Sequence, residues 1–428
     1  MKSMKKILAL VLVLTMALTL LVGCGGKTET AAPAASESED GVVEIYFPTY
    51  MVGEATLAEW CALRIGEFNE QYAGKYKVVV EEIPGDQDYV DKLKVLYAAD
   101  DLPDVIVTGG YNVIDMFRDK LVDLTPYVDD EWRAFMSDVG VKVNSRDGQL
   151  YAIPVIRQVM GYYYNTELFA KAGIEKPAET WEEFFEICDK LLAAGITPLS
   201  MDTADSGWCS SLLLGAIIGT SDAGEEFMNV VQPENYSTPE LIEAAAMVQT
   251  MFQKYTTADA VGAEYAGAAN NFWNEKTAIV ANGPWMVKKF FDPEYCEEGF
   301  GDKIAVAMYP EGLMYNSAQT GWSIAAKTPE KIEASLEFVK FMTNEESQRL
   351  ILEMGGETPD CNVANADTFD LVVETINLAA DCERSINDFQ TLWHASVVDE
   401  ISVQYPLLAT GEITPEEFAD ALTAAAHR

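Results

Sequence analysis

Strands and helices alternate at the start of the folded part of this chain, and that order restricts the folds open to it. Runs rich in β-branched and aromatic residues, typical of strands, are separated by amphipathic stretches typical of helices. A strand–helix–strand–helix–strand order predicts parallel strands, because each crossover helix returns the chain to the same end of the sheet. The predicted strands are 42–47, 76–83 and 103–108, and the predicted helices are 54–72 and 86–99.

The same mixture continues to the C-terminus, so the fold class is α/β. Three threonines are each followed three residues later by glutamate, a pattern with which a helix N-terminus satisfies its free N–H groups. Later strands are expected at 276–282, 303–310 and 322–326, and helices at 239–255, 329–342 and 344–354. The three threonine–glutamate pairs are Thr180 with Glu183, Thr343 with Glu346, and Thr414 with Glu417.

The first 23 residues have the features of a signal peptide. Three lysines precede an uncharged apolar run from Ile7 to Val22, which is shorter than the roughly 20 residues that a membrane-spanning helix needs. The run ends in "LVGC", which resembles the lipobox of bacterial lipoproteins, and Cys24 is the predicted site of lipidation. Residues 24–41 then form a lipid anchor and flexible tether. We therefore expect the protein on the extracellular face of the cell membrane, attached by its lipid only.

The charge of the chain excludes some classes of partner. Its 69 acidic residues against 29 lysines and arginines give a formal net charge of −40 at pH 7. Nucleic acids and anionic lipid surfaces are bound through lysine and arginine, and no basic stripe interrupts the acidic composition. Nucleic-acid binding is therefore not expected, although a local pocket for one anion stays possible. We interpret the acidity as a means of solubility.

The cysteines favour neither a metal site nor a particular disulfide pattern. Cys61 and Cys188 fall in line with apolar residues at helical spacing, which predicts that both are small buried hydrophobic residues. With only His394 and His427 present and no C-x-x-C pair, a zinc site is not expected. The sequence leaves the pairing of the cysteines other than Cys24 open. The other four are Cys209, Cys296, Cys361 and Cys382.

Ligands of open parallel sheets bind beyond the carboxyl ends of the strands. The segments after the first three predicted strands therefore hold candidate binding residues. These are Tyr50, Asp86 and Tyr111. An acidic side chain there has an alternative interpretation as a solvated surface group, because the chain has so many carboxylates.

A tryptophan stands directly after a later predicted strand. The strand 276–282 is followed by Gly283, a proline and then Trp285. An indole in a core is usually placed within an element, where neighbours cover it on all sides. Since Trp285 lies on a turn past the strand end, we expect it to face a cleft.

Eight segments of the mature chain together resemble a family 1 extracellular solute-binding protein, the family of sugar-binding lipoproteins that supply ABC importers. The order of the segments carries the resemblance, and one departure is Glu275, where the family usually has glycine. The segments are "FNEQY", "PDVI", "LVDLTPYV", "GQLYAIPV", "YYYNTELFAKAGIEKPAETWEEF", "FWNEKTAIVANGPW", "GWSIAAKTPEKIEASLEFVKFMTNEESQRL" and "GGETPDCN".

The resemblance implies a type II periplasmic-binding-protein-like fold with two discontinuous lobes, a hinge and an interlobe cleft. It assigns 42–153 plus 306–343 to the first lobe and 154–305 plus 344–428 to the second. Trp285 then becomes a stacking platform for a sugar ring, whose C–H face packs on an aromatic plane.

Four further residues are candidates with open alternatives. Trp322 opens a strand in a segment that faces the cleft in the family, and it contacts ligand or packs in the core. Trp208 and Asp205 lie in a polar turn before an apolar helix. The indole of Trp208 stacks on ligand or packs in the core, and the carboxylate of Asp205 accepts sugar hydroxyls or is solvated.

Arg157, a charge amid apolar residues, needs a partner. As the partner of Arg157 we favour a carboxylate of the protein across the cleft over an acidic sugar. We expect Trp60 to pack in a core.

The sequence thus predicts a substrate-binding lipoprotein, not an enzyme, that captures a neutral mono- or oligosaccharide and delivers it to the permease of an ABC importer. We expect a monomer without cofactor or metal. The alternatives are an acidic sugar or other small polar solute, or an exported polysaccharide hydrolase with two carboxylates at catalytic spacing. Ferric binding through the tyrosines at 162–164 is disfavoured, because their position before "NTELF" fits strand alternation.

Overall fold

A computed structural model describes residues 41–53, 55–107, 113–319, 321–355, 357–360, 363 and 366–428. Contacts divide the chain between Gly41 and Val42, and residues 42–428 form one compact unit. The predicted signal peptide and the lipidation site Cys24 lie outside the described residues, as do Tyr111 and Cys361.

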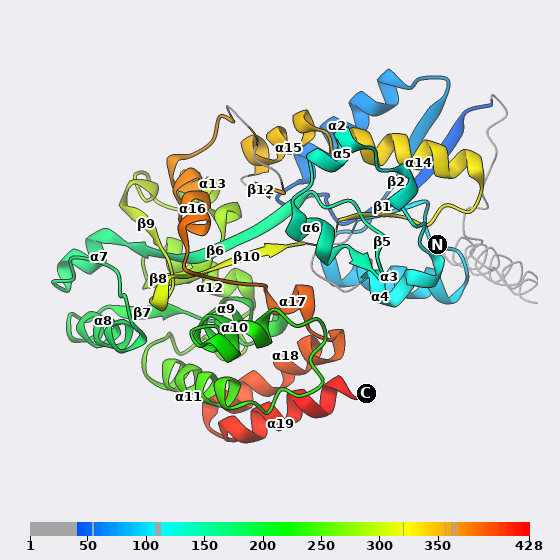
Figure 1. The fold of residues 1–428 in the computed structure, drawn as a ribbon. Coiled ribbons are helices and arrows are strands. Elements are labelled where there is room, and N and C mark those ends of the chain that lie inside the picture. The colour runs from blue at the N-terminus through cyan, green and yellow to red at the C-terminus, as the bar shows by residue number, and fades with distance from the viewer. Residues whose placement is uncertain are drawn as a thin grey trace, which may run out of the picture. The chain divides into compact units, whose positions relative to one another are not determined.

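The strand β6 (Ile156–Asn165) is the centre of a seven-stranded sheet, and it runs through the middle of Figure 1. Along the main path the strands follow the order β13-β10-β6-β8-β7, and β9 and β12 also pair with β6. The partners bound directly to β6 are all antiparallel to it. They are β8 (Thr277–Asn282), β9 (Ile304–Ala307), β10 (Leu313–Ala318) and β12 (Thr358–Pro359), while β7 (Thr197–Ser200) and β13 (Arg384–Ile386) form the outer strands.

Side chains of β6 alternate between two sets of neighbours, as the pleat of a strand requires. Met160 and Tyr162 are buried in the core beneath the sheet, together with the apolar helix α9 (Trp208–Ile218). Val159 and Tyr163 are buried on the other side, where α16 (Asp370–Asp381) packs. The same core as α9 contains α8 (Trp181–Ala193), α11 (Pro239–Lys254), α18 (Ala395–Thr410) and α19 (Pro415–Ala426). Smaller helices around the sheet are α7 (Thr166–Lys171), α10 (Asp222–Met228), α12 (Tyr265–Trp273), α13 (Val287–Phe290) and α17 (Phe389–Leu392).

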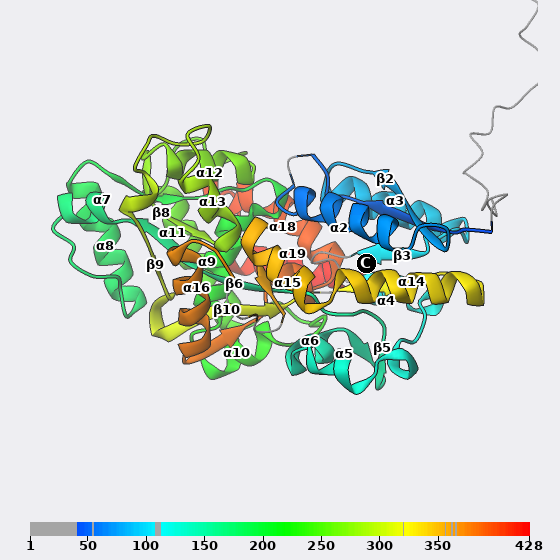
Figure 2. The same cartoon turned by 90° about the horizontal axis from the view of Figure 1, so that it is seen from above.

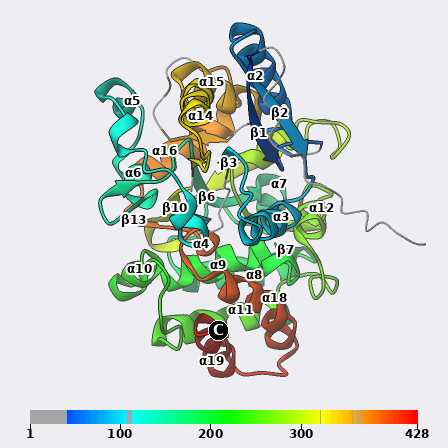
Figure 3. The ribbon, with the colours of Figure 1, turned by 90° about the vertical axis from the view of Figure 1, so that its right-hand side faces the viewer.

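A second hydrophobic core holds the predicted strand–helix alternation. The strands β1 (Val43–Thr49) and β2 (Tyr76–Glu82) pair in parallel as predicted. The helices α2 (Ala58–Gln71) and α14 (Pro329–Met342) pack beside β1 in Figure 2 and Figure 3. The other elements here are α3 (Asp86–Ala98), β3 (Val105–Val107), α4 (Val113–Phe117), α5 (Asp130–Ala134), α6 (Asp138–Val143), β4 (Ser145–Arg146), β5 (Gln149–Leu150), β11 (Trp322–Ile324) and α15 (Glu345–Leu350).

The strand β3 pairs with β11 in antiparallel fashion and meets β1 through one aspartate. The backbone N–H of Tyr46 donates to the carboxylate of Asp104 at 2.9 Å, and the N–H of Asp104 donates to the carbonyl of Tyr46 at 3.1 Å. A side chain therefore replaces a backbone acceptor where β1 and β3 meet. The ammonium of Lys331 neutralises this carboxylate at 2.7 Å.

Two segments pack beside elements that the sequence assigned to the other lobe. Residues 304–318 form β9 and β10 in the seven-stranded sheet, although the sequence placed 306–318 with the first lobe. Conversely, α15 was predicted in the second lobe, but Ile351 at its end is buried in the core that contains β1. The division into lobes stays a proposal.

Two of the three threonine caps form as predicted. Thr180 accepts from the backbone of Glu183, and Thr414 forms a full capping box with Glu417. The prediction for Thr343 was wrong, because α14 extends to Met342 and the next residue after Thr343, Asn344, caps α15 instead. An asparagine one residue nearer to the helix is an equally good cap.

Glu275 takes the backbone conformation that explains a glycine in the family. Its φ is +55°, the left-handed region that glycine adopts readily after a helix C-terminus. Its carboxylate accepts hydrogen bonds from Asn165 at 3.1 Å and Lys303 at 3.0 Å. These bonds compensate for the strain of the turn, so the departure leaves β8 in place.

Candidate ligand-binding site

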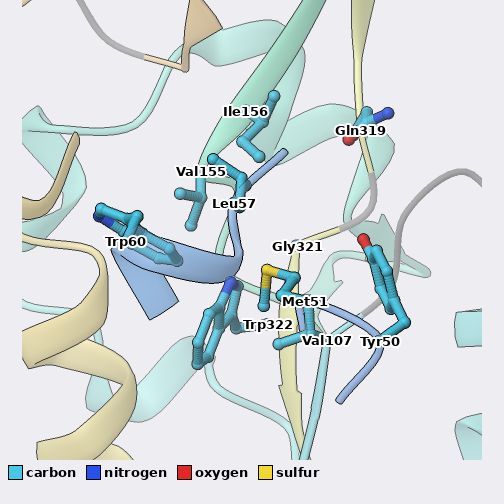
Figure 4. A pocket seen from close by; sticks show the side chains of 10 residues that line it. All are labelled: Tyr50, Met51, Leu57, Trp60, Val107, Val155, Ile156, Gln319, Gly321 and Trp322. Carbon is cyan, nitrogen blue, oxygen red and sulfur yellow. The ribbon is translucent and has the colours of Figure 1, made fainter. Parts of the chain in front are cut away.

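A pocket lies at the end of β1, where the core of the first strands meets the beginning of β6 (Figure 4). The empty space between its lining atoms, counted together with the open solvent at its mouth, is about 330 Å³, so the enclosed part is small. Its lining is aromatic and aliphatic, with one amide side chain. The lining residues are Tyr50, Met51, Leu57, Trp60, Val107, Val155, Ile156, Gln319, Gly321 and Trp322.

Two tryptophans form the base of this pocket and belong largely to the core. Trp322 is 3% exposed, and its ring stacks on Phe47 at 5.3 Å between centroids. Trp60 is 1% exposed and donates its indole N–H to the carbonyl of Ser347, so its predicted packing role is confirmed. Since Phe47 covers one face of Trp322, this indole offers a ligand little more than an edge, and its ligand contact stays a prediction.

Tyr50 was predicted as a binding residue and lies at the edge of the pocket. Its side chain is partly exposed, and Figure 4 shows the ring beside Met51 and Val107. The ring of Tyr89 supports it at 5.5 Å. Of the other two candidates after the first strands, Asp86 begins α3 but its side chain is outside the described part of the structure, as is all of Tyr111.

Trp285 is partly exposed. It lies on the short helical turn Pro284–Met286, which follows β8. Its indole folds back over Gly283, where an added Cβ would lie 2.1 Å from the ring. The indole N–H donates to the hydroxyl oxygen of Tyr265 at 3.3 Å, and the side chain of Asn282 donates to the same oxygen at 3.4 Å. The polar edge of the indole is therefore held by its own neighbours, and the apolar ring remains partly open.

Trp208 lies next to Trp285 and is also partly exposed. The two rings are 6.4 Å apart between centroids and inclined at 52°. Phe389 packs against Trp208 from the other direction at 5.6 Å. Two half-buried indoles thus lie side by side, and we call this pair the Trp208–Trp285 platform.

An unusual turn places Trp208 at the first position of α9. The three preceding residues, Asp205, Ser206 and Gly207, all have φ between +50° and +62°, which is costly for the two that are not glycine. Side chains from two other helices hold Ser206, since Ser402 accepts from its N–H at 2.7 Å and Gln390 donates to its hydroxyl at 3.1 Å. The carboxylate of Asp205 is exposed beside the platform, and its ligand contact stays a prediction.

A buried carboxyl supports the same turn from below. Asp202 accepts from the backbone N–H groups of Ser210 at 3.1 Å and Cys209 at 3.3 Å in the first turn of α9, where a helix favours negative charge. Burial nevertheless raises the pKa of Asp202 to about 6. The carboxyl fixes the start of the helix that carries Trp208.

Arg157 lies on the side of β6 away from the pocket. Its guanidinium is near the side-chain oxygen of Asn316 at 3.4 Å and the carbonyl of Pro359 at 3.5 Å. Both contacts are long for hydrogen bonds, and the favoured carboxylate partner across the cleft stays a prediction. Burial raises the pKa of Asp360, and the charge of Arg157 opposes that rise. Strand alternation accounts for the position of Arg157, since Ile156 points to the pocket and the next residue along the strand points away from it.

Sequence reasoning missed several polar residues near the pocket. Gln319 lines it directly. Gln158 is two residues from Ile156 and therefore on the same face of β6. Glu357 precedes β12 and is partly exposed, while burial raises its pKa to about 7. Alternation along 156–160 is the signal that could have identified this face.

The described residues contain no cluster of three or more histidine, cysteine or acidic side chains able to hold a metal ion. Of the helices in the described part of the chain, none combines the length and apolar composition that crossing a bilayer requires.

Comparison with known proteins identifies relatives of this arrangement. The family described as bacterial extracellular solute-binding protein matches residues 64–369. The "Multiple sugar-binding protein" of Streptococcus mutans is 27% identical over 361 residues, which cover 78% of this chain and 80% of that protein. The "Arabinooligosaccharide-binding protein" of Halalkalibacterium halodurans is 24% identical and covers 59% of this chain and 56% of that protein.

Solved structures share the fold over almost the whole described chain. A chitin oligosaccharide binding protein superposes with a TM-score of 0.79 at 19% identity and covers 90% of this chain and 98% of its own. The maltose-bound MalE3 of T. maritima superposes with a TM-score of 0.73 at 20% identity, covering 90% and 99%. The predicted two-lobed α/β fold is confirmed by these likenesses.

Proposed function

This chain belongs to the bacterial extracellular solute-binding protein family, and on that premise we propose that it captures a neutral mono- or oligosaccharide between its lobes and delivers it to the permease of an ABC importer. The relatives named above are binding proteins for sugars. The proposal therefore involves capture and release of a solute without a catalytic step.

The Trp208–Trp285 platform is the observation that carries this proposal. A pyranose presents a face of C–H groups to an aromatic plane, and its hydroxyls need fixed donors and acceptors around it. The platform supplies two neighbouring rings 6.4 Å apart, and the pocket of the other core supplies Tyr50 and the amide of Gln319. A sugar held by both would draw the lobes from an open to a closed arrangement, because only the closed one makes both sets of contacts.

We further propose that Cys24 carries a lipid and that this lipid alone tethers the protein to the outer surface of the membrane. The basis is the signal-like segment and the "LVGC" motif. A single acyl chain binds membranes only marginally. The diacylglycerol and amide-linked acyl groups that a lipobox implies would anchor the chain firmly. Replacing Cys24 by serine should release the protein into the medium, whereas membrane retention of the variant would contradict the anchor.

A thermal-shift screen of the purified protein tests the sugar assignment. The panel should contain maltose, raffinose, chitobiose, arabino- and xylo-oligosaccharides, galacturonate and glucosamine. A neutral sugar at 100 times its Kd should stabilise the folded protein by about 2.7 kcal/mol. Stabilisation by galacturonate alone, or by none of these sugars, would contradict the proposal.

A further inference from the structure

Glu357 is an enclosed carboxyl group to which the proposed function assigns no role. It stands in the segment that enters β12, the short strand paired with the beginning of β6. Its side chain is partly exposed, yet burial alone raises its pKa to about 7, with no charged neighbour contributing. Solvent thus reaches part of this side chain, and the described residues give its carboxyl no charged or hydrogen-bonding partner.

Strand register places this side chain on the side of the sheet that faces the pocket. Thr358 is directly opposite Arg157, and both point away from the pocket. Side chains alternate along an extended chain, so Glu357 points to the opposite side, which it shares with Gln158 and the pocket residue Ile156. Glu357 therefore lies on the face of the sheet that Ile156 presents to the pocket.

The charged residues of every neighbouring element are engaged elsewhere. On the helix before β12, Glu353 pairs with Arg349 at 2.7 Å. Lys288 of α13 donates to the carbonyl of Met354 at 3.3 Å. Beyond β12, Asp360 accepts from the hydroxyl and backbone of Ser137, and Arg157 is on the far face. In the described part of the chain, Glu357 has neither a hydrogen bond nor an ion pair.

A partly enclosed polar group without a partner is costly, and a charged one more so. A titratable group with a strongly perturbed pKa beside a cleft is a candidate for a functional site. A carboxylate accepts hydrogen bonds and donates none. Hydroxyl and ammonium groups suit it, whereas a second carboxylate would be repelled.

We propose that Glu357 selects the solute: its carboxylate accepts hydrogen bonds from hydroxyl or ammonium groups of the bound sugar and excludes a sugar that presents a carboxylate at that position. This inference rests on the proposed function and makes it more specific. It decides against the acidic sugars that the sequence left open as an alternative.

Calorimetry with the neutral sugar that gives the largest thermal shift tests the assignment at pH 6, 7 and 8. Because the sugar binds the ionised carboxylate, binding at pH 6 must release a proton, and the Kd should be about tenfold weaker at pH 6 than at pH 8. Titrations in two buffers of different ionisation enthalpy should report that proton. Glu357→Gln should weaken binding and remove both the pH dependence and the proton release. Glu353→Gln breaks a surface pair on the preceding helix. It should leave the affinity, its pH dependence and the proton release unchanged.

The outcomes separate this inference from its premise. If a sugar binds and Glu357→Gln leaves its affinity and pH dependence as in the original protein, Glu357 does not contact the solute. Binding of galacturonate to the original protein at pH 8 would likewise overturn the inference. If Glu357→Gln gains affinity for galacturonate, the exclusion is supported. A panel in which no sugar binds contradicts the proposed function and this inference together. Thermal unfolding of each variant establishes that it is folded.

Discussion

The indole nitrogen of Trp285 donates a hydrogen bond to the hydroxyl oxygen of Tyr265, 3.3 Å away. This bond occupies the polar edge of the ring within its own lobe. Asn282, the last residue of β8, donates to the same oxygen. The orientation of the platform is thereby tied to the end of the strand that precedes it.

Removing the Tyr265 hydroxyl should therefore weaken sugar binding without unfolding the protein. A hydrogen bond of this kind contributes about 0.5–1.5 kcal/mol, and we expect Tyr265→Phe to weaken the Kd by about twofold to tenfold in calorimetry. Tyr72→Phe is a matched control, since it removes a hydroxyl bonded to Glu337 in the other core. Equal affinities for the two variants would contradict a positioning role for Tyr265.

Adding one methyl group at Gly283 should displace the indole. The backbone there has φ −124°, which alanine adopts without strain. The new Cβ would lie 2.1 Å from the ring of Trp285, so the ring must move. We expect Gly283→Ala to approach the affinity loss of Trp285→Ala while remaining folded by circular dichroism.

The matched control for that change is Gly66→Ala in α2, where an added Cβ meets nothing within 4 Å. It should raise stability slightly, because alanine favours helix by up to about 1 kcal/mol over glycine. Its sugar affinity should not change. An unchanged Kd for Gly283→Ala would show that the ring position does not matter for binding.

The local alternation of strands and helices was predictable because it depends on residues close in sequence. The bounds of β1, β2, α11 and α14 differ from the prediction by a few residues at most. The pairing of β10 with β6 was not predictable, since β6 lies more than 150 residues earlier in the chain. Local pattern carries no information about that partner.

The candidate site was predictable to a similar extent. The turn after β8 indicated a partly exposed Trp285, and the structure confirms that the ring is partly exposed. The expectation that the ring faces a cleft stays a prediction. The sequence could not show that Phe47 covers Trp322, because the contact joins distant strands. For Arg157 and Glu357, alternation could separate the two faces of the strands, but only the tertiary packing shows which face carries the pocket.

The stability of the protein should depend on pH through Asp202. Burial raises its pKa in the folded state to about 6, against 3.8 in the unfolded chain. The folded state therefore binds the proton more tightly, and the contribution of Asp202 to the free energy of unfolding is full below pH 3.8 and lost as the pH rises to about 6. The shift corresponds to about 3 kcal/mol.

Urea unfolding of Asp202→Asn between pH 4 and 7 measures this contribution. In the original protein the free energy of unfolding should decline between pH 4 and 6. The variant should lose the part of this decline that belongs to the carboxyl of Asp202. Asp205→Asn, which changes an exposed aspartate in the same segment, should keep the decline. A slope in Asp202→Asn identical to that of the original protein would contradict a raised pKa.

The thiols should divide into two reactivity classes. Cys61, Cys188 and Cys209 are free and buried, as predicted for the first two, while Cys296 and Cys382 are free and partly exposed. Burial raises the pKa of Cys61 to about 12, which suppresses the reactive thiolate. Among these five described thiols, maleimide labelling with peptide mapping should modify the partly exposed pair in the folded protein and all five in urea. Rapid labelling of Cys209 would show that α9 opens readily.

The most direct test of the account is calorimetry with the best neutral sugar on the original protein and on Trp208→Ala, Trp285→Ala and the double variant. Each single change should weaken binding by about 1–3 kcal/mol, and the double variant should lose measurable binding while keeping its unfolding temperature within a few degrees. Tyr127→Ala, at an exposed aromatic residue away from the platform, should bind as the original does. A double variant with the affinity of the original protein would contradict capture of a sugar on this platform.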